Sequence, residues 1–178
     1  MNNISLKYTM RNAFTLIELL IVITIIGIAS ALIVPYVGSR SDLQVAAVAR
    51  SFIADVQYTQ NLAITTRQRH GLLFAADQYT VERFSGTTAI TIKHPIEKDN
   101  FVVRLGSSGK DVRRGVAMPL VNVRQGAVRL VFDSMGTPMA FSGTTFISTD
   151  APVRVTLSAG TATIVVRIEP FTGEVTVE

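Results

Sequence analysis

The sequence predicts an α+β fold, in which one long N-terminal helix packs on an antiparallel β head. Three observations predict it. An apolar run covers residues 14–34, an amphipathic stretch of helical period follows as far as Thr66, and from His70 onward the apolar residues alternate between turn signals. These patterns divide the chain into a polar segment (1–13), an apolar helix (14–35) and a head (36–178) that includes the amphipathic half of the helix.

Composition excludes several functional classes. The chain has no Cys, which excludes a disulfide framework, a thiolate nucleophile and a Cys-ligated metal. The 17 Lys and Arg residues outnumber the 13 Asp and Glu residues, but Lys7 and Arg11 precede the apolar run. Because the rest of the chain is close to neutral, net charge gives no argument for nucleic acid as a partner.

The apolar run has the length of a membrane span. Phe14 to Val34, built as a helix at about 1.5 Å per residue, would cover the roughly 30 Å of a bilayer core. The basic residues before it predict a cytoplasmic N-terminus and a translocated head. A plain membrane anchor and a secretory signal peptide are the alternatives, and the apolar region of a signal peptide is shorter, about 7–15 residues. The small residues at 29–31 that resemble a cut site also lie inside the run.

Glu18 is the one charged residue in that run. A carboxylate inside a bilayer is costly, at about 2.5–3.5 kcal/mol for Asp on insertion scales, so an intramembrane acid indicates function. No Lys, Arg or His lies between Phe14 and Ser39. The sequence therefore predicts that the cation for Glu18 comes from elsewhere.

The string FTLIELLIVITIIGI, residues 14–28, resembles the processing and assembly motif of type IV prepilins. The resemblance implies that a prepilin peptidase cuts between Ala13 and Phe14 on the cytoplasmic side, and that the new Phe14 amine is methylated. It also implies that Glu18 meets the terminal amine of a neighbouring subunit during assembly. Pro35 matches a proline that is frequent in the family. Ala13 departs from the usual Gly before the cut, which implies slower cleavage.

After a bend at Pro35, the helix is predicted to continue to about Thr66. Its apolar residues lie near one face of a 3.6-residue period, which predicts that this half packs on the head. That face consists of Val45, Ala49, Phe52, Val56 and Ala63, with Ile53 and Ile64 beside it.

The head is predicted from the alternating segments. Hairpins are expected around residues 76–78 and 158–160, with turns at 133–136 and 172–173, and residues 106–125 are expected to hold a loop. The predicted strands are Leu72–Ala75, Tyr79–Phe84, Ala89–Lys93, Phe101–Leu105, Ala127–Phe132, Val153–Leu157, Thr161–Ile168 and Glu174–Val177.

Three further strings, RSFIADVQYTQNLAITTRQ, RLVFDSMGTP and VVRIEPFTGEVTV, are similar to the H-type minor pseudopilins of type II secretion and to related minor type IV pilins. The matching positions are Phe132, Asp133, Gly136, Thr172 and Gly173. The resemblance implies a pilin-like structural subunit of the secretion pseudopilus, with a minor type IV pilin for pilus initiation or DNA uptake as the alternative.

The same resemblance implies the partners and the location. The partners would be a prepilin peptidase, other minor and major pseudopilins or pilins, an inner-membrane assembly platform, and membrane lipid before assembly. The protein would cross the bacterial inner membrane once, with a cytoplasmic N-terminus and a periplasmic head, and then join a periplasmic fibre.

A basic run is the main other candidate site. Clustered arginines can bind a phosphate backbone, which makes Arg113, Arg114 and Arg124 candidate DNA contacts. A solvated loop is the favoured interpretation, because no aromatic residues interleave with the charges. The run comprises Arg104, Lys110, Arg113, Arg114, Arg124 and Arg129, offset by Asp111.

Catalytic motifs fail on inspection. His70 and His94 are the two histidines, and no G-x-S-x-G elbow supports a triad with either. Gly106–Lys110 resembles a phosphate loop but has Asp111 where Ser or Thr is needed. The sequence predicts a protein that is not an enzyme, with no cofactor and no metal.

Overall fold

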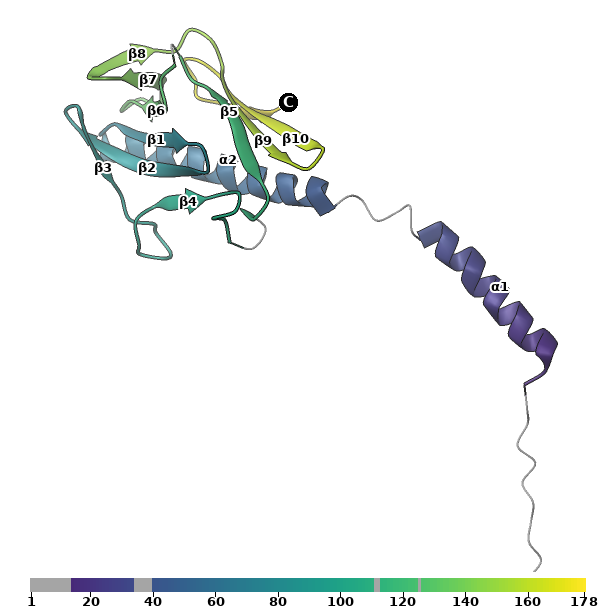
Figure 1. Cartoon of the computed structure of the whole chain (residues 1–178). Helices are drawn as coiled ribbons and strands as arrows, with labels where there is room; N and C mark the ends of the chain where they lie inside the picture. The colour runs from purple at the N-terminus through teal and green to yellow at the C-terminus, as the bar shows by residue number, and fades with distance from the viewer. Residues whose placement is uncertain (1–13, 34–39, 111–112, 125) are drawn as a thin grey trace, which may run out of the picture. The chain divides into compact units, whose positions relative to one another are not determined.

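The structure, a computed structural model, describes residues 14–33, 40–110, 113–124 and 126–178 (Figure 1). The chain divides into two compact units, Met1–Gly38 and Ser39–Glu178. In the first unit, helix α1 spans Leu16–Ile33. Within the residues that the structure describes, no helix combines the length and the hydropathy needed to cross a membrane. The predicted bend at Pro35 and the predicted continuity of the helix lie outside the described residues.

The second unit begins with helix α2, Arg40–Thr66. Asp42 lies in its first turn, where a negative charge is favourable to the helix dipole. The helix ends where predicted, because Arg67 has a φ of 53°, the left-handed conformation that commonly follows a helix C-terminus. The predicted apolar face is confirmed and is wider than expected. Its buried residues are Val45, Val48, Ala49, Phe52, Val56, Thr59 and Ala63.

Antiparallel strands follow α2 and form two sheets. The first has the order β3-β2-β1-β6-β7-β8, with β4 also paired to β2, and the second has the order β11-β10-β9-β5. The observed α+β class with antiparallel sheets agrees with the prediction and is compatible with a pilin-like head. The strands are β1 (His70–Ala75), β2 (Gln78–Ser85), β3 (Thr88–Thr91), β4 (Val102–Arg104), β5 (Ala117–Asn122), β6 (Arg129–Phe132), β7 (Pro138–Ser142), β8 (Thr145–Ser148), β9 (Val153–Ala159), β10 (Ala162–Ile168) and β11 (Val175–Val177).

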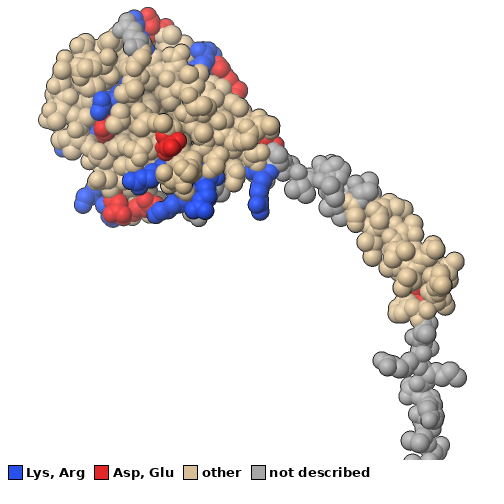
Figure 2. All heavy atoms as spheres, viewed as in Figure 1, with Lys and Arg blue, Asp and Glu red and all other residues tan. Residues whose placement is uncertain are grey.

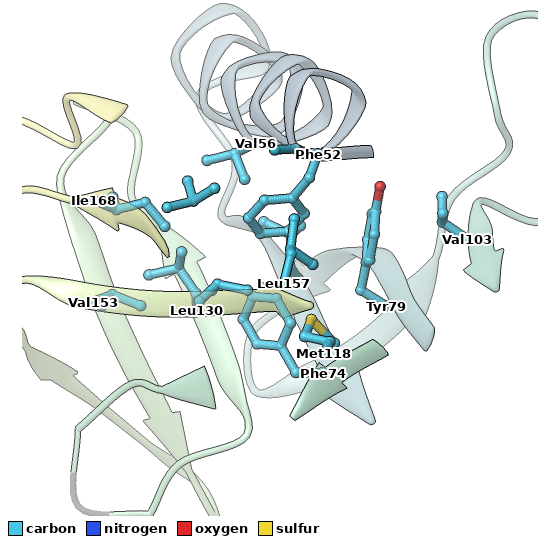
Figure 3. Packing of buried hydrophobic residues seen from close by; sticks show 14 of the residues in the cluster. Phe52, Val56, Phe74, Tyr79, Val103, Met118, Leu130, Val153, Leu157 and Ile168 are labelled. Atoms are coloured by element: carbon cyan, nitrogen blue, oxygen red, sulfur yellow. The ribbon is translucent and has the colours of Figure 1, made fainter. Parts of the chain in front are cut away.

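The main core lies between α2 and the two sheets. Figure 3 shows Phe52 and Val56 pointing from α2 toward Leu130 of the first sheet and Leu157 of the second. The ring of Phe52, fully buried, packs edge-on against Tyr79 with centroids 5.2 Å apart. One helix face therefore holds both sheets together, which explains why its apolar stripe is wide.

Two elements differ from the sequence prediction. The expected loop at 106–125 contains a strand, β5. Pro119 is compatible with this strand because β5 lies at the edge of its sheet, whereas proline is disfavoured in a central strand. The pairing of β5 with β9 also shifts register between Ala117 and Leu120, so the irregularity absorbs the proline. The hairpin of β7 and β8 was not predicted, although Gly143, with a φ of 62°, closes it in a two-residue turn.

Candidate functional site

Thr15 caps the start of α1. Its hydroxyl accepts a hydrogen bond from the Glu18 backbone N–H at 3.3 Å, and its carbonyl accepts one from the Leu19 N–H at 3.2 Å. Thr15 is thus the N-cap, and Glu18 occupies the third helical position, as in a capping box. The T-x-x-E spacing before an apolar run is the sequence signal for such a cap, and this cap was not among the predictions above.

The predicted assembly residues are both accessible. Phe14 is 78% exposed, Glu18 is exposed, and among the described residues Glu18 has no ion-pair partner. Glu18 lies in the first turn of α1, at the positive end of the helix dipole. Glu18 and Phe14 therefore lie on either side of the cap residue Thr15, at the start of α1. Ala13, on the other side of the predicted cut, lies outside the described residues.

The residues of the predicted basic run lie in different surroundings. Arg104, Lys110 and Arg113 line one cavity of about 140 Å³, together with the acids Glu97 and Asp99. Figure 2 shows Lys and Arg side chains interspersed with Asp and Glu along the edge of the head where β4 lies in Figure 1.

The other arginines of that run lie apart from this cavity. Arg124 forms an ion pair with Asp150 at 2.8 Å and donates to the Ser148 carbonyl, and Arg129 forms one with Glu82 at 3.0 Å. Arg114 is exposed, and Asp111 lies outside the described residues. A DNA contact through Arg113, Arg114 and Arg124 stays a prediction.

Both histidine rings form hydrogen bonds with backbone groups of nearby residues. His70 is buried, and its Nδ1 donates to the Gln68 carbonyl at 2.9 Å. Burial lowers the pKa of His70, so the ring is neutral at pH 7. The His94 Nδ1 accepts hydrogen bonds from the backbone N–H groups of Ile96 and Glu97, and its ring packs edge-on against Phe101.

Two of the positions that were compared with H-type pseudopilins, Gly136 and Thr172, are bonded by one residue, Gln60 of α2. The Gln60 Nε2 donates to the carbonyl oxygens of Gly136 and Thr172, each at 3.0 Å. The first turn, Asp133–Gly136, is closed by Asp133, whose Oδ1 accepts hydrogen bonds from the N–H groups of residues 135 and 137. The second turn, Pro170–Gly173, is closed by a Gly173 N–H to Glu169 carbonyl bond.

We call Gln60 and the two turns that it bonds the Gln60 junction. The backbone geometry of this junction requires both of its glycines. Gly136 has a φ of 84° and Gly173 a φ of 69°, and both are buried. A Cβ on Gly173 would lie 2.5 Å from the Gln60 Nε2 and 2.9 Å from the Gly136 carbonyl oxygen. The sequence predicted turns at both glycines but not the role of Gln60, since an amide on an amphipathic helix is typical of a surface residue.

Asp55 and Tyr79 form a polar pair beside the core. The Tyr79 hydroxyl donates to the Asp55 Oδ2 at 2.6 Å. Burial raises the pKa of Asp55 above its ordinary value of 3.8, and the weaker effect of the Tyr79 hydrogen bond lowers it. The folded head therefore favours the neutral carboxyl group, so between the ordinary and the raised pKa it binds more protons than the unfolded chain.

This pair predicts a pH-dependent stability. The contribution of Asp55 is full below pH 3.8 and is lost as the pH rises through its raised pKa. Asp55→Asn keeps an acceptor for Tyr79 and cannot ionise, so its melting temperature at pH 7 is expected to exceed that of the wild type, with the difference vanishing at acid pH. Thermal unfolding of the full chain from pH 3 to pH 8 measures this. Glu97→Gln, which changes an exposed carboxylate, is the control, and parallel curves for Asp55→Asn and wild type would contradict the prediction.

Comparison with known proteins addresses the N-terminal segment. Residues 9–34 match the family described as the prokaryotic N-terminal methylation motif. No curated protein and no solved structure matches the chain. The motif supports a type IV prepilin-like protein that is processed by prepilin peptidase, a class with a membrane-anchored N-terminus.

Proposed function

We propose that the protein is a minor pseudopilin, a structural subunit of the type II secretion pseudopilus. The observation that carries the proposal is the methylation motif at residues 9–34, with Phe14 and Glu18 accessible at a capped helix start. The likeness of Phe132, Asp133, Gly136, Thr172 and Gly173 to H-type pseudopilins supports the finer assignment. Gln60 bonds the carbonyl groups of Gly136 and Thr172, and Gly173 lies against Gln60 and Phe132.

In this proposal the protein waits in the inner membrane with its N-terminus in the cytoplasm and its head in the periplasm. The peptidase removes residues 1–13 and the Phe14 amine is methylated. The assembly platform then extracts the subunit into the fibre, where Glu18 pairs with the terminal amine of a neighbouring pilin or pseudopilin. The protein itself has no enzymatic activity and needs no cofactor or metal.

A minor type IV pilin, acting in pilus initiation or DNA uptake, is the second candidate. Arg104, Lys110 and Arg113 favour it, because they surround one cavity on the head. Glu97 and Asp99 line the same cavity and reduce its positive charge, so the secretion subunit is the leading proposal.

Processing tests the proposed class. When the full chain is expressed with a prepilin peptidase, mass spectrometry is expected to find residues 1–13 removed and a methyl group on Phe14. Without the peptidase the chain stays whole. Ala13→Gly is expected to be cut faster, since Gly is the usual residue at that position in the family. An uncut chain in both strains, or a cut after Ala31, would exclude the proposal.

A further inference from the structure

Phe171 is held in an unfavourable conformation without being buried. Its φ is 66°, in the left-handed region that bulky side chains rarely adopt, and it is 65% exposed. The positive φ of Arg67 has an explanation, since that residue ends α2. Because the Phe171 ring is mostly exposed, its packing contributes little free energy to offset the backbone strain. Strained residues of this kind concentrate at functional sites.

Other exposed apolar side chains come from the elements that meet at Gln60. Met135, in the turn Asp133–Gly136, is 79% exposed, and Ile64, one helical turn beyond Gln60, is 44% exposed. Because Gln60 bonds the turns of both Met135 and Phe171, the two turns lie side by side. We call Ile64, Met135 and Phe171 the turn-pair patch. Monomeric proteins seldom expose clustered large apolar side chains unless another molecule covers them.

A basic cavity borders this patch. It has a volume of about 540 Å³ and is lined by Arg67, Arg69 and Arg83, against the single carboxylate of Asp133. Asp133 and Ser134 line the cavity and precede Met135 in the same turn, so cavity and patch share that turn. Within the described parts of the chain, none of the three arginines forms an ion pair.

The guanidinium groups of the cavity are partly fixed in place. The Arg69 guanidinium carbon lies 4.4 Å from the centroid of the Phe146 ring, and the Arg83 Nη1 donates to the Gln68 Oε1 at 3.4 Å. A planar cation that stacks on a ring keeps its N–H donors at the edge, free for a carboxylate. The cavity is thus arranged to receive a carboxylate group without large side-chain movement.

We propose that the turn-pair patch and the basic cavity form one docking surface, and that its partner is a segment of another protein that presents bulky apolar side chains next to carboxylates. The patch would take the apolar side chains, and Arg67, Arg69 and Arg83 would pair with the acids. The surface lies at the C-terminal end of α2, roughly 40 Å along the helix from Arg40. A partner bound there does not compete with whatever the N-terminal end of α2 contacts.

A second copy of this chain fits the surface poorly. Its loop with exposed Ile96, Glu97 and Asp99 has the required residue types, but Lys93, Lys98 and Arg104 lie around the same loop. These cations would face the cavity arginines. DNA also fits poorly, because Asp133 lines the cavity and the patch offers one ring beside two aliphatic side chains rather than a series of stacking platforms.

The test measures peptide binding to the full chain in neutral lipid nanodiscs. The probe is a fluorescein-labelled peptide of alternating glutamate and leucine, followed by fluorescence anisotropy with empty nanodiscs as baseline. Peptides of alternating lysine and leucine, or glutamate and serine, are expected to bind at least about tenfold more weakly, because each lacks one half of the match. Equal binding of either peptide would overturn the proposal.

Variants separate docking from folding. Phe171→Gly is expected to weaken the glutamate–leucine peptide about tenfold while the melting temperature stays level or rises, because glycine adopts this φ without strain. The double variant Arg69→Gln and Arg83→Gln is expected to weaken it to a similar degree. Ile96→Ser, on the loop before β4, and Arg104→Gln, at the end of β4, are the matched controls and should bind as wild type does.

Three further results would overturn the inference. Unchanged peptide affinity in Phe171→Gly would remove the patch from the surface. A DNA duplex that displaces the peptide and loses affinity in the double arginine variant would identify a nucleic-acid site instead. Dimers of the full chain that disappear in Phe171→Gly would assign the surface to a second copy.

Discussion

Replacing Gly173 with alanine is expected to lower the free energy of unfolding by about 3 kcal/mol, which corresponds to a fall in melting temperature of about 10 °C. The left-handed φ of 69° costs an alanine about 1 kcal/mol. The new Cβ would overlap the Gln60 Nε2 at 2.5 Å and displace it from two carbonyl acceptors. Each lost hydrogen bond contributes about 1 kcal/mol more.

Gly143→Ala is the matched control. Gly143 also has a left-handed φ, 62°, but a Cβ there would meet nothing within 4 Å. It should therefore lose only the backbone contribution of about 1 kcal/mol. Thermal unfolding of the full chain compares the two. If the close contact with Gln60 is responsible, Gly173→Ala costs less in a Gln60→Ala background, and equal losses for Gly173→Ala and Gly143→Ala would contradict this account.

Glu18→Ala is expected to reduce incorporation into the fibre about 100-fold or more, while cleavage before Phe14 continues. The proposed pair between Glu18 and a neighbour's terminal amine forms away from water, and removing one partner of a buried ion pair costs about 3–5 kcal/mol. Glu18→Gln should lose nearly as much, since it keeps the shape of the side chain but not its charge. Immunoblotting of sheared fibres, with mass spectrometry of the cellular pool, measures both steps.

Thr24→Ala and Ser30→Ala serve as controls on the same helix. Their hydroxyls bond within α1, to the carbonyls of Leu20 and Ile26, so neither is needed for a neighbour. Both variants should be incorporated at the wild-type level. Wild-type incorporation of Glu18→Ala would show that the carboxylate has no part in assembly.

Periodicity predicted the parts of the fold whose side chains face one way. The stripe from Val45 to Ala63 and the alternation in β9 follow directly from burial on one face, whereas β1 and β2 are buried along most of their length. β5 could not be recognised in this way, because Pro119 and the register shift break its pattern. The hairpin of β7 and β8 was missed although Gly143 provided a turn signal.

The sites were predictable only where they are continuous in sequence. The segment around Phe14 and Glu18 is one string, and the comparison with known families agrees with it. The basic run was also read as a string, yet folding sends Arg124 and Arg129 to separate acids. The cavity of Arg67, Arg69 and Arg83 joins the end of α2 to β2, a proximity that the order of residues does not reveal.

The Gln60 junction also has a consequence for the timing of folding. Its two acceptors follow Gln60 by 76 and 112 residues, so Gln60 is synthesised well before either carbonyl group that it bonds. Closing such long loops is slow, and local structure such as α2 forms first. The junction therefore cannot close before residue 172 has been synthesised. Chains truncated before that residue are expected to remain open at this junction and exposed to proteolysis, so closure of the junction depends on both turns being present.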